Sequence, residues 1–152
     1  MIDANLLVLL IVGSADRGVI KGRTFKGLKE YGTDDYDLLR SFVTGAQRLV
    51  VTPHILAETS NLLSRTHDSL NRRLFTEFRG LLNDVELVDE IFLPSAAAAN
   101  RPEFVWLGLT DAAALLFSEH DITLLTSDAR LADAAGKARI DVINFNHHRT
   151  GL

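Results

Sequence analysis

Hydrophobic residues follow two patterns along the chain, and polar or glycine-containing segments separate them. Apolar residues three or four positions apart, such as Leu70, Leu74 and Phe78, are typical of amphipathic helices. Short aliphatic runs bounded by polar residues indicate buried strands. We expect helices at residues 6–12, 34–47, 53–64, 69–82, 95–100, 110–120 and 129–135. We expect short strands at residues 1–5, 49–52, 85–88, 122–126 and 141–145.

Local signals mark where some of these elements begin and end. Pro53 fits the first position of a helix, where its missing N–H is not needed, and Thr52 before it is a good N-cap. Gly136 is expected to end the last helix. The alternation of short strands and helices predicts one domain, residues 1–152, with a parallel sheet covered by helices. Ligands bind such sheets outside the carboxyl ends of the strands, so functional residues are expected at that edge.

Residues 13–32 depart from this pattern, because five glycines there are interspersed with five basic residues. This composition predicts a mobile basic loop with at most one helical turn. A group of Lys and Arg side chains on such a loop can bind phosphates, although a solvated surface is the ordinary alternative. The candidate substrate-binding residues are Arg17, Lys21, Arg23 and Lys26. Smaller basic groups are Arg72 with Arg73, and Arg130 with Lys137 and Arg139.

The composition is that of an ordinary folded protein and excludes several kinds of site. Hydrophobic residues make up 47% and charged residues 24% of the 152 residues. The absence of Cys excludes disulfides, thiolate zinc sites and iron–sulfur clusters. The longest aliphatic run, residues 6–12, is far shorter than the roughly 20 residues of a membrane span. No basic residue precedes this run as in a signal peptide, so we expect a cytoplasmic protein without membrane association.

One glutamate occupies an unusual position in a predicted helix. Glu58 lies three residues after Ile55 and four before Leu62, within the apolar stripe of its helix. A carboxylate that faces an apolar interior is unfavourable unless it is paired or binds a cation. A salt bridge to an arginine, or a place at the rim of the stripe, is the ordinary alternative. His54, one turn before Glu58, is interpreted as a polar residue of the first turn.

Three aspartates fall at or near the same predicted edge of the sheet. Asp3 ends the first strand, Asp111 lies in a first helical turn, and Asp128 directly follows the strand at residues 122–126. Each has an ordinary explanation: a surface turn for Asp3, the helix dipole for Asp111 and an N-cap for Asp128. Four carboxylates gathered at one edge would repel strongly, and one or two divalent cations would relieve that repulsion. Oxygen ligands favour Mg²⁺ or Mn²⁺.

The net charge of −4, from 16 basic and 20 acidic residues, argues against non-specific coating of DNA. Two bound divalent cations would bring the formal charge to zero, which makes the composition compatible with an RNA substrate.

Four short motifs follow one another across nearly the whole chain. They are Met1-Ile-Asp-Ala-Asn5, Val51-Thr-Pro-His-Ile-Leu-Ala-Glu58, Leu109-Thr-Asp-Ala-Ala113 and Leu125-Thr-Ser-Asp-Ala-Arg-Leu131. Each motif is weak alone, but in this order the chain resembles a PIN-domain ribonuclease, of the kind found as VapC-type toxins of toxin–antitoxin pairs. The resemblance implies a three-layer PIN-like α/β domain, with a parallel five-stranded sheet flanked by helices.

The resemblance also implies a chemistry and its residues. It implies a metal-dependent endoribonuclease that hydrolyses RNA phosphodiesters and leaves a 5′-phosphate. The four acids that would bind Mg²⁺ or Mn²⁺ and carry catalysis are Asp3, Glu58, Asp111 and Asp128. Asn5 and Thr126 match positions that orient these acids without binding metal. As partners the resemblance implies a second copy of the chain, in a homodimer, and a cognate antitoxin protein.

Two other interpretations remain open. A haloacid-dehalogenase-like phosphatase also begins with an Asp followed two positions later by a polar residue. It would need Asp where Asn5 stands, and it does not account for Glu58. The other interpretation is a catalytically silent PIN-like module that only binds RNA or a protein, and the presence of all four acids counts against it. RNA cleavage, phosphomonoesterase and metal-binding assays separate the three.

Overall fold

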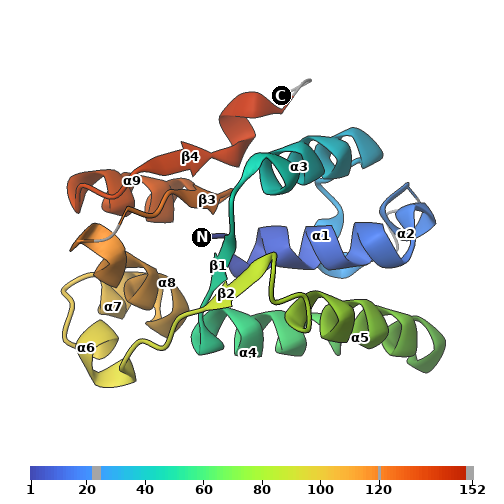
Figure 1. The fold of residues 1–152 in the computed structure, drawn as a ribbon, viewed down its shortest axis with the longest axis horizontal. Coiled ribbons are helices and arrows are strands. Elements are labelled where there is room, and N and C mark those ends of the chain that lie inside the picture. Colours follow the sequence, from blue (N-terminus) through green and yellow to red (C-terminus); the bar gives the residue numbers. More distant parts are fainter. Residues whose placement is uncertain (22–24, 120, 150–152) are drawn as a thin grey trace.

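The computed structural model describes residues 1–21, 25–119 and 121–149, and helices make up most of this part of the chain (Figure 1). The α-helices are α1 (Ala4–Ala15), α2 (Arg17–Lys21), α3 (Thr33–Gly45), α4 (Pro53–Leu63), α5 (Asp68–Leu82), α6 (Ser95–Ala99), α7 (Phe104–Leu107), α8 (Leu109–Ala114) and α9 (Ala129–Lys137). The 3₁₀ helices are η1 (Lys26–Leu28), η2 (Leu115–Glu119) and η3 (Phe145–His148). No helix in these residues is long and apolar enough to cross a membrane.

The strands are short and pair in two parallel sets. Strand β1 (Leu49–Val51) pairs with β2 (Val88–Glu90), and β3 (Leu124–Thr126) pairs with β4 (Val142–Asn144). The extended residues 1–3 lie between the two pairs. The Ile2 N–H donates to the Val50 carbonyl at 3.3 Å, and the Asp3 N–H donates to the Leu125 carbonyl at 3.0 Å. Ile2 makes a single parallel bridge with Leu125.

The predicted three-layer domain with a five-stranded parallel sheet is therefore wrong. Among the described residues the structure has two separate two-stranded sheets and one isolated bridge. The reason lies at Asp3, which ends the extended segment by capping α1: its carboxylate accepts a hydrogen bond from the Leu6 N–H at 2.8 Å. The segment before α1 therefore contributes only the bridge between Ile2 and Leu125, and no full central strand forms among the residues described.

Helix α1 forms the centre of the hydrophobic core. All its residues from Leu6 to Gly13 are buried, as expected for a helix that is apolar on every side. Figure 1 shows α1 running across the molecule, with α3 on one side and α4 and α5 on the other. Gly13 allows α3 to approach closely, because a Cβ there would lie 2.1 Å from the ring of Tyr36.

Residues 13–32 do not form the predicted mobile loop where the structure describes them. Helix α1 continues to Ala15, α2 follows, and η1 comes later. Val19 and Ile20 of α2 are buried, and so are Phe25, just before η1, and Leu28, the last residue of η1. Despite the glycines and basic residues around them, these four apolar side chains attach the segment to the core.

Candidate carboxylate site

Asp3 is almost completely buried at the start of α1, and its carboxylate is held by three donors. Oδ1 accepts the Leu6 N–H at 2.8 Å, and Oδ2 accepts the Ser127 N–H at 2.9 Å and the hydroxyl of Thr126. Burial raises the pKa of Asp3 above its usual range, although these three hydrogen bonds oppose the rise. Asp3 is therefore fixed in place between the beginning of α1 and the end of β3.

Asp128 caps α9 and is joined to Asp3 through Thr126. Its Oδ1 accepts the backbone N–H groups of Arg130 and Leu131, at 2.7 and 3.1 Å. Its own N–H donates to the Thr126 hydroxyl oxygen at 3.0 Å. The capping role anticipated for Asp128 is thus present, and both capping bonds use the same carboxylate oxygen. Thr126 contacts both ends of the predicted acidic site, which is the geometry expected of an orienting residue.

Asp111, in the first turn of α8, has a pKa that is raised by burial and by the negative charges of the other three acids. Burial, together with the negative charges of Asp3, Glu58 and Asp128, raises the pKa of Asp111 from 3.8 to about 7. Arg130 acts in the opposite direction and lowers it. The four acids come from four separate parts of the chain: Asp3 precedes α1, Glu58 lies on α4, Asp111 lies on α8 and Asp128 precedes α9. We call Asp3, Glu58, Asp111 and Asp128 the carboxylate cluster.

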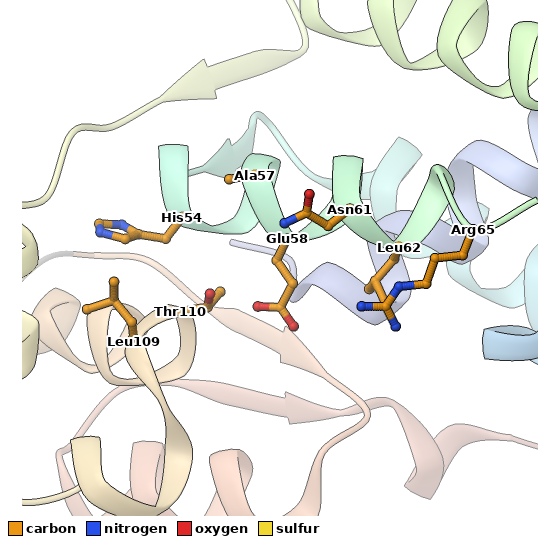
Figure 2. A pocket seen from close by; sticks show the side chains of 8 residues that line it. All are labelled: His54, Ala57, Glu58, Asn61, Leu62, Arg65, Leu109 and Thr110. Atoms are coloured by element: carbon orange, nitrogen blue, oxygen red, sulfur yellow. The ribbon is translucent and has the colours of Figure 1, made fainter.

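Glu58 lies on the wall of a cleft between α4 and the start of α8 (Figure 2). The cleft measures about 370 Å³ and is lined by His54, Ala57, Glu58, Asn61, Leu62, Arg65, Leu109 and Thr110. In Figure 2 the Glu58 carboxylate points away from α4 into this space, while the His54 ring lies at the beginning of the same helix. His54 Nε2 is hydrogen-bonded to Ser95 Oγ at 2.8 Å. Arg65 is the cation of the cleft lining.

Glu58 does not face the apolar interior but lies at the rim of the stripe, which is the ordinary alternative for this residue. The core-facing residues of α4 are Ile55, Thr59 and Leu63, four positions apart. Glu58 is half-buried and faces the cleft together with Leu62. One apolar stripe in the sequence thus corresponds to two surfaces, one packed against α1 and one open. Within the described residues Glu58 makes no ion pair, so the salt-bridge alternative is not what holds it there.

A second, polar cleft of about 260 Å³ lies beside Asp128. Its lining consists of Asn5, Gly27, Glu30, Tyr31, Ser127, Asp128 and Asn146. Asn5 thus lies beside Asp128, on an exposed position of the first turn of α1. Arg149 stabilises this region: its guanidinium pairs with Asp35 at 2.8 Å and lies 4.9 Å from the Tyr31 ring centroid.

The predicted phosphate-binding residues lie at different distances from the carboxylate cluster. Arg17 pairs with Asp37 at 2.5 Å, and Lys21 ends α2. Both follow the carboxyl end of α1, whereas Asp3 caps its amino end, so a helix of roughly 18 Å separates them from Asp3 (Figure 1). Arg23 lies outside the described residues, and so does the side chain of Lys26. Gly27, next to Lys26, lines the polar cleft beside Asp128.

Two residues near the cluster were not singled out from the sequence. The Arg130 guanidinium lies over the Trp106 ring, 5.3 Å from its centroid, and also donates to the Trp106 carbonyl. Arg130 was grouped only with other basic residues, and helix α7, which carries Trp106, was not predicted. The available signal was that Trp106 is the only tryptophan in the chain and comes shortly before the motif at residues 109–113.

Within the described part of the chain, no group of three or more His, Asp or Glu side chains is arranged so that it could hold a metal ion. The donor chemistry nevertheless suits a hard divalent cation, because the four acids offer only oxygen ligands and three of them act on Asp111 with their negative charge. Comparison of the chain with protein-family models, with curated proteins and with solved structures gave no match.

Proposed function

We propose that the protein is a metal-dependent ribonuclease that hydrolyses RNA phosphodiesters at the carboxylate cluster, with Mg²⁺ or Mn²⁺ as its cation. The observation that carries this proposal is the environment of Asp111, where burial and the negative charges of Asp3, Glu58 and Asp128 raise its pKa from 3.8 to about 7. Repulsion between such charges is unfavourable for folding and is relieved when a cation binds. Perturbed carboxylates beside an open cleft are a recognised sign of a functional site.

The residues of the cluster differ in how firmly the surrounding structure holds them. When bound, such a cation stabilises the charge of the transition state and lowers the pKa of an attacking water. Asp3 and Asp128 are held in fixed orientations by Thr126 and by the first turns of α1 and α9. Asp111 lies on α8 and feels the charge of Glu58 on α4, and the cleft that Glu58 lines, about 370 Å³, opens beside them.

The resemblance to PIN-domain ribonucleases supports the same proposal and extends it. On that basis we propose a toxin of a type II toxin–antitoxin pair that acts on cytoplasmic RNA, forms a homodimer and is bound by a cognate antitoxin. The four motifs that carry the resemblance contain the four acids of the cluster.

The test is cleavage of an end-labelled single-stranded RNA with Mg²⁺, with Mn²⁺ or with a chelator. We expect cleavage only with added cation, and its loss in Asp111→Asn and in Asp128→Asn. Asn remains a good N-cap, so Asp128→Asn keeps α9 capped and removes only the charge. The matched control is Asp133→Asn, which removes an exposed acid from the same helix. Undiminished cleavage in both cluster variants contradicts the proposal.

Two further measurements separate the alternatives. Calorimetric titration with Mg²⁺ and Mn²⁺ tests whether the cluster binds a cation, and the signal should disappear in Asp111→Asn. Binding of metal and RNA without cleavage would identify a catalytically silent module. Hydrolysis of a phosphomonoester, with RNA left intact, would identify a phosphatase.

A further inference from the structure

Helix α7 and the residue that begins α8 expose apolar side chains close to the carboxylate cluster. Val105 is 85%, Trp106 43% and Leu109 38% exposed. A group of exposed apolar residues in a folded domain marks a surface that binds something. Leu109 also lines the cleft that contains Glu58, so this surface continues into the proposed site.

The Trp106 ring is held in a defined position rather than left free. Arg130 lies over the ring and donates to the carbonyl of the same residue. The backbone N–H of Trp106 donates to the Glu103 carbonyl at 3.1 Å, which fixes the main chain that carries the ring, and Gly108 ends α7 with a φ of 84°. That φ is accessible to glycine and strained for other residues, so the chain turns directly from α7 into α8 at this point. A half-exposed aromatic ring in a fixed orientation is suited to stacking against a flat ligand.

Arg130 connects this ring to the cluster. Its backbone N–H donates to Asp128 at 2.7 Å, and its charge acts on Asp111, five residues after Trp106. A ligand stacked on the indole therefore lies beside both a guanidinium and the proposed catalytic acids. Nucleic acid strands combine these features, since their bases stack on aromatic rings and their phosphates attract arginine.

We propose that Trp106 and Arg130 form a stacking platform for one unpaired base of the RNA strand that is cleaved at the carboxylate cluster. The substrate is therefore single-stranded at that position, because a base inside a duplex has no free face to offer. This inference rests on the proposed ribonuclease function and specifies its substrate class. A protein partner fits this surface less well, since an apolar interface would have to bury the Arg130 guanidinium away from water.

The first experiment uses Trp106 as its own reporter, because no other tryptophan is present. The Asp111→Asn variant, with Mg²⁺, is titrated with a single-stranded RNA and with a duplex of the same length, and intrinsic fluorescence is recorded. We expect the single strand to quench the fluorescence in a saturable way and the duplex to have little effect. Binding of the single strand without quenching, detected through a label on the RNA, overturns the proposal.

The second experiment compares affinities by fluorescence polarisation of labelled single-stranded RNA. Trp106→Ala is expected to weaken binding by about 5- to 150-fold, the range typical of losing one base–aromatic stack. Trp106→Phe keeps a ring and should retain most of the affinity. The matched control is Val85→Thr, which removes an exposed apolar side chain outside this surface, 71% exposed, and should leave RNA affinity unchanged.

The possible failures are distinguishable. If Trp106→Ala binds and cleaves single-stranded RNA as well as the Val85→Thr control does, the stacking platform is wrong while the ribonuclease stands. If the wild type binds the single strand with quenching but never cleaves it, the platform stands and the nuclease function is wrong. If light scattering shows that Trp106→Ala changes only the oligomeric state, the surface is a protein interface and the proposal is overturned.

Discussion

The hydroxyl of Thr126 donates a hydrogen bond to the carboxylate of Asp3, although the two residues are 123 positions apart in the chain. The same hydroxyl oxygen accepts the N–H of Asp128 at 3.0 Å. Thr126 is fully buried at the end of β3, so this one side chain joins the beginning of α1 to the beginning of α9. Fold and proposed site therefore depend on the same contact.

The first prediction concerns this contact. Thr126→Val keeps the shape of the side chain but leaves the buried Asp3 carboxylate without one of its donors. We expect a loss of about 1–3 kcal/mol in the free energy of unfolding, measured by urea denaturation. The pKa of Asp3 should rise further, since the Thr126 hydrogen bond lowers it. Thr126→Ser keeps the hydroxyl and should retain most of the stability; a serine variant as unstable as the valine variant contradicts this account.

The second prediction is a pH dependence of stability in the metal-free protein. The folded state raises the pKa of Asp111 from 3.8 to about 7, so it binds this proton more tightly than the unfolded chain does. The contribution of Asp111 is therefore most favourable below pH 4 and is lost as the pH rises towards 7. The shift corresponds to a loss on the order of 4 kcal/mol.

Asp111→Asn tests this directly, because asparagine has nearly the same shape and no charge. With a chelator present, we expect the variant to be more stable than the wild type at pH 8 and similar to it near pH 4. Thermal unfolding across this range measures the difference. Added Mg²⁺ should stabilise the wild type at pH 8 and leave the variant unchanged. A variant that is less stable at pH 8 would show that Asp111 has a structural role instead.

Helices with strong local signals could be predicted from the sequence, and elements without them could not. Helices α4 and α5 lie within one residue of their expected bounds, because Thr52 and Pro53 define one start and the spacing of Leu70, Leu74 and Phe78 defines a long apolar face. Helix α7 has only four residues, too few to show a period. The five-stranded sheet failed because Asp3 looked like the end of a strand, whereas it is the cap of a helix.

The site follows the same division between local and long-range information. The sequence could predict that Asp3 and Asp128 lie near each other, because each follows a predicted strand and the ends of parallel strands meet at one edge of a sheet. The direction of Glu58 could not, because spacing alone does not tell which of two faces of α4 is covered. The pairing of Trp106 with Arg130 joins α7 to α9 and has no signature in either segment.

The third prediction concerns the end of α9, which was expected at Gly136 and lies beyond it. Arg139 has a φ of 60° and follows the helix in a Schellman motif, in which the Ile140 N–H donates to the Ala135 carbonyl at 3.0 Å. This conformation is strained for arginine and free for glycine. Arg139→Gly is expected to stabilise the protein by roughly 0.5–1 kcal/mol in urea denaturation. Arg139→Ala keeps a Cβ and should bring no gain; an equal gain from alanine would mean that the arginine side chain, and not the backbone, is unfavourable.

The last prediction concerns the contact between α1 and α3. A methyl group at Gly13 would lie 2.1 Å from the buried Tyr36 ring, so Gly13→Ala should lower the free energy of unfolding by about 1–3 kcal/mol despite the better helix propensity of alanine. Gly80→Ala in α5 is the matched control, because nothing lies within 4 Å of its added Cβ.

Gly80→Ala should gain about 1 kcal/mol. Removing the ring tests the cause: Tyr36→Ala is itself destabilising, but Gly13→Ala added to it should no longer cost stability. If Gly13→Ala were equally harmful with and without the Tyr36 ring, close packing of α1 on α3 would not be the reason for glycine at this position.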